Sequence, residues 1–183
     1  EMNLSDNGFS VEGIRSMVPF LQNSNNLRLL CLDGNNIQSE GFNLLFRALC
    51  DSPIEYLCCS RCDIESIEID GNEIPNNLAS LFLSSNRINS DGCRGLAKLL
   101  QGGDSTLATL RLGSNKIDDE GVGILVDSLQ NNTSLKTLDL RNNDGISNQG
   151  RIMLLKLVND ISSIKATLQS NHTLRFIYVR GII

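Results

Sequence analysis

The chain has 183 residues, of which 40% are hydrophobic and 20% charged, enough for one folded domain with a sizeable core. Its formal net charge of -5 disfavours contact with phosphate backbones, so nucleic acid is not an expected partner. No apolar run approaches the roughly 20 residues that span a bilayer, so we expect no membrane association. The first residues also lack the basic and apolar regions of a signal peptide.

Leucines recur along the chain at positions that a repeated structural unit explains. The pattern is L-x-x-L-x-L-x-x-N-x-I, and between Leu27 and Leu135 its copies recur at spacings of 24 to 29 residues. In chain order the clear copies are Leu27, Leu30, Leu32, Asn35, Ile37; Leu78, Leu81, Leu83, Asn86, Ile88; Leu107, Leu110, Leu112, Asn115, Ile117; and Leu135, Leu138, Leu140, Asn143, Ile146. Weaker copies at residues 2–9, 54–64 and 174–179 bring the total to about seven repeats.

Each copy predicts a strand, a turn and a return segment. The alternation in residues 30–32 predicts a short strand with one buried face. A turn follows, in which the side-chain amide of Asn35 can form hydrogen bonds with the backbone of adjacent coils. In one copy Cys62 replaces this asparagine. Acidic residues suited to helix N-termini open return helices at residues 39–41, 90–92 and 118–121.

Two copies depart from this plan. Residues 54–77 form a short, irregular repeat that alternates after Ile64 and contains Pro75, which predicts an extended or 3₁₀ return instead of a helix. The interval from Leu135 to Leu174 is 39 residues long and predicts a long or broken helix over 148–169, within a final return segment 148–173. We expect one domain over residues 1–183. We also expect a fragment of a longer solenoid, because the terminal strands have no capping element. The alternative is edge-to-edge self-association, which bare terminal strands invite.

Residues 30–41 and 110–121 both carry the phrase L-x-L-x-x-N-x-I-x-x-x-G. This phrase resembles the leucine-rich repeats of the ribonuclease-inhibitor-like type, which also occur in the Ran GTPase-activating protein and in NOD-like receptors. The resemblance covers essentially the whole chain. It implies an α/β leucine-rich repeat solenoid with the shape of a horseshoe arc, in which a parallel sheet lines the concave face and helices cover the convex face.

Function on such a fold depends on the residues that point out of the sheet. Leu29, Tyr56 and Phe82 are predicted to form an apolar strip across three adjacent strands, because aromatic residues and Arg dominate binding hot spots. The full predicted partner-binding set is Leu29, Cys31, Asp33, Tyr56, Cys58, Phe82, Arg111, Asp139 and Arg141. The alternative is that outward aromatics are ordinary strand formers, with Phe176 and Tyr178 covered by a further repeat. The remaining aromatics, Phe9, Phe20, Phe42 and Phe46, match core or helix-stripe positions.

The chain offers no predicted site for chemistry. The six cysteines are unevenly placed, with three of them at 58, 59 and 62. The repeat register points Cys58 outward and the other two inward, so they cannot form one tetrahedral metal site. His172, the only histidine, falls in a turn, and there is no glycine-rich phosphate loop. We therefore expect neither a catalytic residue nor a cofactor.

The leading hypothesis is a non-catalytic module that binds a protein or peptide on its concave face. Two alternatives remain open at this stage: a regulator of a small GTPase of the Ran GTPase-activating type, and the ligand-sensing repeat region of a larger NOD-like receptor. Unpaired, reduced cysteines favour a cytoplasmic location, although a Cys31–Cys58 disulfide is conceivable. Glycosylation sequons at Asn131, Asn132 and Asn171 keep an extracellular location open.

Overall fold

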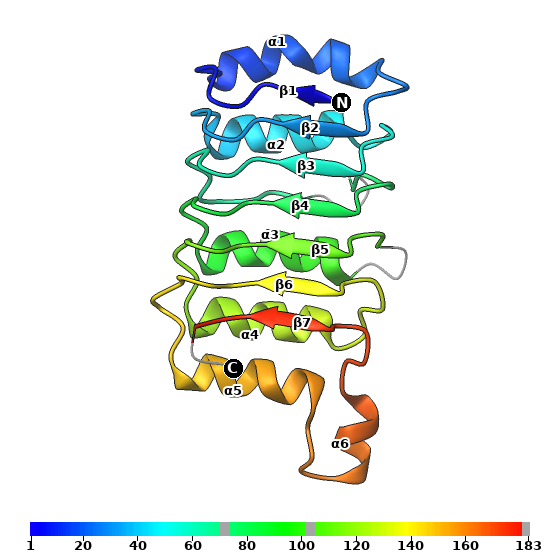
Figure 1. Cartoon of the computed structure of the whole chain (residues 1–183), viewed down its shortest axis with the longest axis vertical. Helices are drawn as coiled ribbons and strands as arrows, with labels where there is room; N and C mark the ends of the chain where they lie inside the picture. Colours follow the sequence, from blue (N-terminus) through cyan, green and yellow to red (C-terminus); the bar gives the residue numbers. More distant parts are fainter. Residues whose placement is uncertain (70–73, 102–104, 181–183) are drawn as a thin grey trace.

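The computed structural model describes residues 1–69, 74–101 and 105–180 of the chain. Within them, short strands form one parallel sheet whose spatial order repeats their order in the sequence (Figure 1). The strands are β1 (Met2–Asn3), β2 (Leu29–Cys31), β3 (Tyr56–Cys58), β4 (Ser80–Phe82), β5 (Thr109–Arg111), β6 (Thr137–Asp139) and β7 (Phe176–Tyr178). Each predicted repeat contributes one strand, which confirms the predicted α/β solenoid.

Helices on the return segments cover one face of the sheet and leave the other face open (Figure 1). They are α1 (Val11–Gln22), α2 (Gln38–Ala48), α3 (Ser90–Gln101), α4 (Asp119–Leu129), α5 (Asn148–Val158) and the short α6 (Ile164–Gln169). The predicted N-termini of α2, α3 and α4 are confirmed to within one or two residues. Asp118 caps α4, and its side chain accepts a hydrogen bond from the Gly121 N–H.

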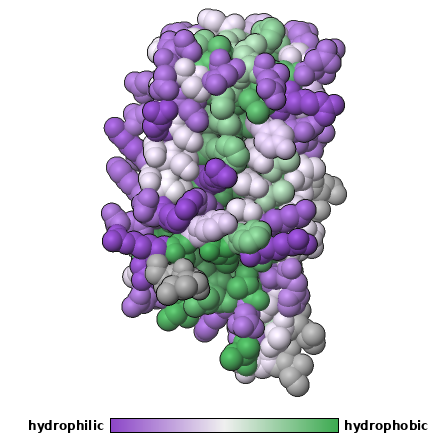
Figure 2. Space-filling view, in the orientation of Figure 1, coloured by the Kyte–Doolittle hydropathy of each residue, from purple (hydrophilic) through white to green (hydrophobic). Residues whose placement is uncertain are grey.

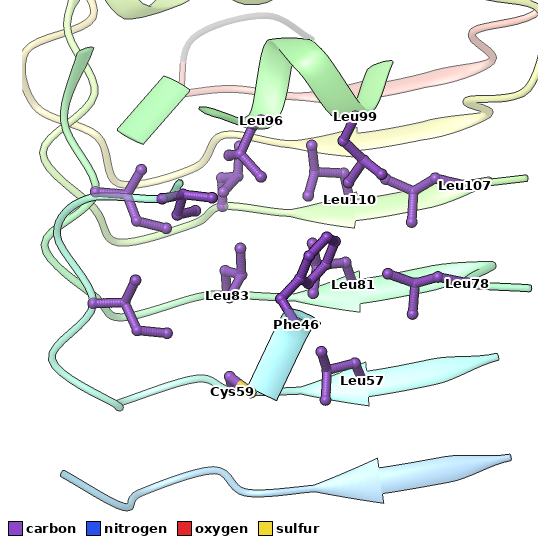
Figure 3. Packing of buried hydrophobic residues seen from close by; sticks show 14 of the residues in the cluster. Phe46, Leu57, Cys59, Leu78, Leu81, Leu83, Leu96, Leu99, Leu107 and Leu110 are labelled. Carbon is purple, nitrogen blue, oxygen red and sulfur yellow. The ribbon is translucent and has the colours of Figure 1, made fainter. Parts of the chain in front are cut away.

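The core lies between the sheet and the helices. Leu57, Leu81 and Leu110 lie opposite one another on neighbouring strands and have no exposed surface. Figure 3 shows Leu96 and Leu99 of α3 reaching from the helix toward the leucines of β5. Each fully buried leucine stabilises the fold by about 1.5–3 kcal/mol relative to an exposed one. Since one coil cannot enclose its own leucines, this stabilisation depends on the neighbouring coils.

Buried asparagines fix the turns that follow the strands. The Asn115 amide donates to the carbonyl oxygens of Leu83 (2.9 Å) and Leu112 (3.0 Å), and its side-chain oxygen accepts from the Ile88 N–H (3.0 Å). Equivalent bonds are made by Asn35, Asn86 and Asn143. This ladder links each coil to the coil before it and satisfies backbone groups that the tight bend would otherwise leave unpaired.

Cys62 interrupts the asparagine ladder. Its thiol donates to the carbonyl oxygen of Leu32 at 3.2 Å, but the thiol has no amide oxygen to offer in return. The N–H of Ile37, which corresponds to that of Ile88, therefore donates to the carbonyl oxygen of Asn35 in its own turn (2.9 Å). One cross-coil bond is replaced by a local bond at this position.

The return segment after β3 contains no helix in its described residues, 60–69 and 74–79. Side chains of α2 satisfy its backbone instead. The N–H groups of Glu65 and Ser66 both donate to the hydroxyl of Ser39 at 3.0 Å, and the N–H of Glu68 donates to the side-chain oxygen of Asn43 at 3.1 Å. The extended segment therefore lies beside α2, in the same layer as the helices.

On its other side the same segment lies against α3. Gly92 and Gly95 permit this close approach, since a Cβ on Gly95 would lie 2.0 Å from the carbonyl oxygen of Ile67. The Lys98 ammonium donates to the carbonyl oxygen of Ile69 at 3.0 Å. The extended segment therefore occupies the space between α2 and α3, where a helix would stand in a regular coil.

The final return segment consists of two helices, α5 and α6, separated by a break after Val158. This agrees with a broken helix over residues 148–169. Asn159 ends α5, and the Ser163 hydroxyl caps α6 by accepting from the Ala166 N–H at 3.0 Å.

The prediction that Phe20 lies on the buried stripe of its helix is wrong, because this side chain is 51% exposed. The stripe of α1 is formed by Ile14 and Leu21, which have no exposed surface, with Met17 and Val18 partly buried beside them. Phe20 precedes Leu21 by one residue, which turns it about 100° away from the stripe.

Candidate functional site

The open face of the sheet presents outward side chains in rows that run across the strands. The first row is Leu29, Tyr56, Ser80, Thr109, Thr137 and Phe176, in the register of the paired strands. The second row is Asn3, Cys31, Cys58, Phe82, Arg111, Asp139 and Tyr178. The turns after the strands add Asp33, Gly113 and Arg141. All nine residues that the sequence predicted for partner binding therefore lie on one continuous face.

Leu29, Cys31, Tyr56, Cys58 and Phe82 lie on β2, β3 and β4, and we call them the apolar half of this face. Leu29 lies directly opposite Tyr56, and Cys58 lies directly opposite Phe82. The Tyr56 side chain is 41% exposed and has no hydrogen bond within the described structure. Figure 2 shows green to white surface at the level of these strands.

The predicted apolar strip is stepped instead of straight. Tyr56 belongs to the first row and Phe82 to the second, and the residue opposite Tyr56 on β4 is Ser80. Cys58 connects the two aromatic residues, but only 6% of Cys58 is exposed, so it contributes little area. Repeat spacing placed these residues on the face without showing which of them share a row.

Arg111, Gly113, Asp139 and Arg141 lie at β5 and β6, and we call them the basic half of the face. Figure 2 shows hydrophilic surface crossing the sheet at this level. The Arg111 guanidinium lies over the Phe82 ring, 4.7 Å from its centroid. A cation above an aromatic face is attracted by the electron density of the ring, so this contact joins the two halves.

Asp139 is 5% exposed and is neutralised by Arg141 through two side-chain contacts, Nε–Oδ1 at 3.0 Å and Nη2–Oδ2 at 2.6 Å. Burial opposes ionisation of this carboxyl, but the hydrogen bonds and charge of Arg141 outweigh it, so the pKa of Asp139 is lowered. The Arg141 guanidinium also lies 5.1 Å from the Tyr178 ring centroid. Asp139 therefore positions Arg141 and offers little surface of its own to a partner.

Sequence reasoning did not anticipate the two arginine–aromatic contacts. The signal for one of them was present in the register, since Arg111 follows Phe82 along one row. Asp33 sits at the opposite end of the face, where its carboxylate accepts a hydrogen bond from the Ser60 N–H at 2.6 Å.

The cysteines divide between the two faces of the sheet. Cys31 and Cys58 lie side by side on the open face, whereas Cys59 and Cys62 have no exposed surface. Burial raises the pKa of the Cys58 thiol, and the adjacent Cys31 adds to this effect. The cysteines of the described residues form no disulfide bond with one another. Among the described residues, no cluster of three or more His, Cys, Asp or Glu side chains has the arrangement of a metal site.

A groove of about 870 Å³ lies away from the sheet face, between the C-terminal ends of α4 and α5 and the segment of α6. Its lining combines Met153 and Leu157 with the charged side chains of Asp127, Lys156 and Asp160. The described part of the chain contains no helix that combines the length and apolar character needed to cross a bilayer.

Comparison with known proteins agrees with this architecture. Residues 103–123 and 131–155 match the family model described as Leucine Rich repeat. The structure is similar to that of Leiomodin-1 Actin-Binding Site 2 (ABS2), with a TM-score of 0.60 and 16% sequence identity over 92% of this chain and 79% of that chain. No curated protein matches the sequence.

The chain has the fold of a leucine-rich repeat solenoid. Its sheet order, its repeated leucine register and the structural similarity all define the same solenoid. At this level of identity the similarity establishes the fold alone.

Proposed function

We propose that this protein is a non-catalytic recognition module that binds a protein or peptide partner on the open face of its sheet. The apolar half of the face carries the proposal. Tyr56 and Phe82 project from strands whose backbones are hydrogen-bonded on both sides, so their positions are fixed before a partner arrives. Rigid aromatic anchors on a preformed surface lose little conformational entropy on binding.

The return helices support a finer assignment to the ribonuclease-inhibitor-like type of repeat. The first five helices are 11 or 12 residues long, and each lies on the return of one coil. Repeats of this type alternate strands with helices of several turns, as the resemblance in residues 30–41 and 110–121 implies.

The arrangement of titratable groups favours binding over catalysis. His172 is exposed and lies in the turn before β7, outside the rows of the open face.

A GTP-hydrolysis assay separates this proposal from a regulator of small GTPases. Acceleration by a stoichiometric amount of the protein would support the regulator, and no acceleration agrees with a binding module.

The test compares aromatic residues on the two faces of the solenoid. Partners captured by the unmodified chain are titrated against Tyr56→Ala, Phe82→Ala and the matched control Phe20→Ala on α1. We expect each of the first two to lose about 1–3 kcal/mol of binding free energy, and the control to lose none. Thermal unfolding of all three variants verifies that they fold. Equal binding by all three would refute the proposed face.

A further inference from the structure

We infer that the partner presents an acidic side chain, whose carboxylate binds the guanidinium group of Arg111 beside the apolar half of the face. This inference rests on the proposed binding function and specifies the chemistry of the partner. It commits to an Asp or Glu of a peptide segment that also carries an apolar residue for the apolar half.

Arg111 has no ion pair in the described structure. No carboxylate lies within 4.0 Å of it among the residues that the structure describes, and its guanidinium lies over the Phe82 ring, 4.7 Å from the centroid. The guanidinium carries five N–H donors, and none of them has a hydrogen-bond partner among the described residues. Stacking on Phe82 limits the rotamers of Arg111, so binding an anion costs less entropy.

Arg141 lies in the turn after β6. Asp139 engages its Nε and Nη2, and its guanidinium lies 5.1 Å from the centroid of the Tyr178 ring. The Arg141 side chain is nonetheless 60% exposed, and its other terminal nitrogen has no partner in the described structure. The two arginines and Asp139 together carry a net charge of +1, so the basic half attracts an anion although the whole chain is acidic.

Gly113 lies two residues after Arg111 and is buried. A Cβ there would meet the carbonyl oxygen of Arg141 at 3.4 Å and a carboxylate oxygen of Asp139 at 3.7 Å. Because these oxygens would repel an anion placed over Gly113, the carboxylate of the partner is assigned to the guanidinium group of Arg111.

The spacing of the two halves describes the peptide. Tyr56 on β3 and Arg111 on β5 are two strands apart, which corresponds to about 10 Å. An extended peptide advances about 3.3 Å per residue, so its apolar anchor and its acidic residue are about three residues apart when it crosses the strands.

The probe is a display library of unphosphorylated random peptides of about 12 residues, which span roughly 40 Å when extended. Peptides are selected on the complete chain and retained if Tyr56→Ala abolishes their binding. We expect the retained peptides to be enriched in Asp or Glu about three residues from an apolar residue. A charge-assisted hydrogen bond of this kind contributes at least about tenfold in affinity.

Arg111→Glu should weaken these peptides by about tenfold or more, and a selection on that variant should favour Lys or Arg instead. Arg111→Gln tests the same loss without introducing a charge beside Asp139. Arg175→Glu is the matched control, since it makes the same charge change at an exposed residue outside the basic half. Tyr56-dependent peptides without acidic enrichment, or with unchanged affinity for both Arg111 variants, would overturn the inference and leave the proposed function standing. If no selected peptide depends on Tyr56, the proposed function fails, and the inference fails with it.

Discussion

Two coils of this solenoid reach the same strand geometry by different routes. The coil of β5 and α4 has an asparagine at its turn, a capped helix on its return and a full set of cross-coil hydrogen bonds. The coil of β3 has Cys62 at its turn and an extended return. The strands of both nevertheless pair in one unbroken register.

The difference shows what a coil of this stack requires. A return helix is dispensable where neighbouring helices satisfy the exposed backbone, as Ser39 and Asn43 do on one side and Lys98 on the other. The thinner return needs close contact with α3, which Gly92 and Gly95 permit. Because the irregularity is confined to the helical layer, Tyr56 keeps its place in the rows of the open face.

The largest effect on the free energy of unfolding is expected from a substitution that fills the space between the extended return segment and α3. Gly95→Ala would place a Cβ against the backbone oxygen of Ile67, and we expect it to lower the free energy of unfolding by about 3 kcal/mol or more. Gly123→Ala in α4 is the matched control, since its Cβ would meet only Met153 at 3.8 Å. The control should be neutral or stabilise by up to about 1 kcal/mol. Equal effects in urea unfolding would show that the extended return does not need this glycine.

The asparagine ladder should matter more in the regular coil. Asn115→Ala removes two donated bonds and one accepted bond from a buried turn, and we expect a loss of about 2–3 kcal/mol. Cys62→Ala removes only a weak thiol bond and a small volume, so it should cost about 1 kcal/mol. Chemical denaturation measures both. A larger cost for the cysteine variant would contradict the ladder as described.

Restoring the ladder should have a smaller and opposite effect. Cys62→Asn supplies an oxygen that the Ile37 N–H can reach across the coils, as Asn115 does for Ile88. We expect a gain of about 1 kcal/mol, because asparagine and cysteine are close in size. A loss of stability would mean that the buried turn does not accommodate an amide in place of the Cys62 thiol.

The smallest effect concerns the helix cap that only the regular coil possesses. Hydrogen bonds from the Gly121 N–H and the Ser90 hydroxyl lower the pKa of Asp118 below its ordinary value of 3.8. A lowered pKa in the folded state adds stability above about pH 4 and loses it as the pH falls through the lowered pKa. Asp118→Asn should reduce this acid dependence while costing only a few tenths of a kcal/mol at neutral pH. Unfolding curves between pH 2 and 7 measure the difference, and identical pH profiles for both proteins would exclude the cap as a contributor.

The leucine spacing predicted the strands, their register and the buried face, because only one alternation places every leucine inward. It also predicted that the segment after Ile64 lacks a helix, since alternation and Pro75 oppose one. The spacing did not predict the rows of the open face in detail. The stacking of Arg111 on Phe82 and the coverage of Cys58 depend on side-chain rotamers across neighbouring strands, which a repeat pattern does not encode. Phe20 was wrongly predicted to be buried because it is adjacent in sequence to Leu21, which does lie on the buried face of α1.

The central claim is that partners bind the sheet face and not the helical face. A photoreactive benzoylphenylalanine placed at Tyr56 tests it directly, with the same group at Phe20 as the comparison. Illumination in the presence of a bound partner should give a covalent adduct from position 56 and none from position 20. An adduct from position 20 alone would assign binding to the helical face and contradict the account.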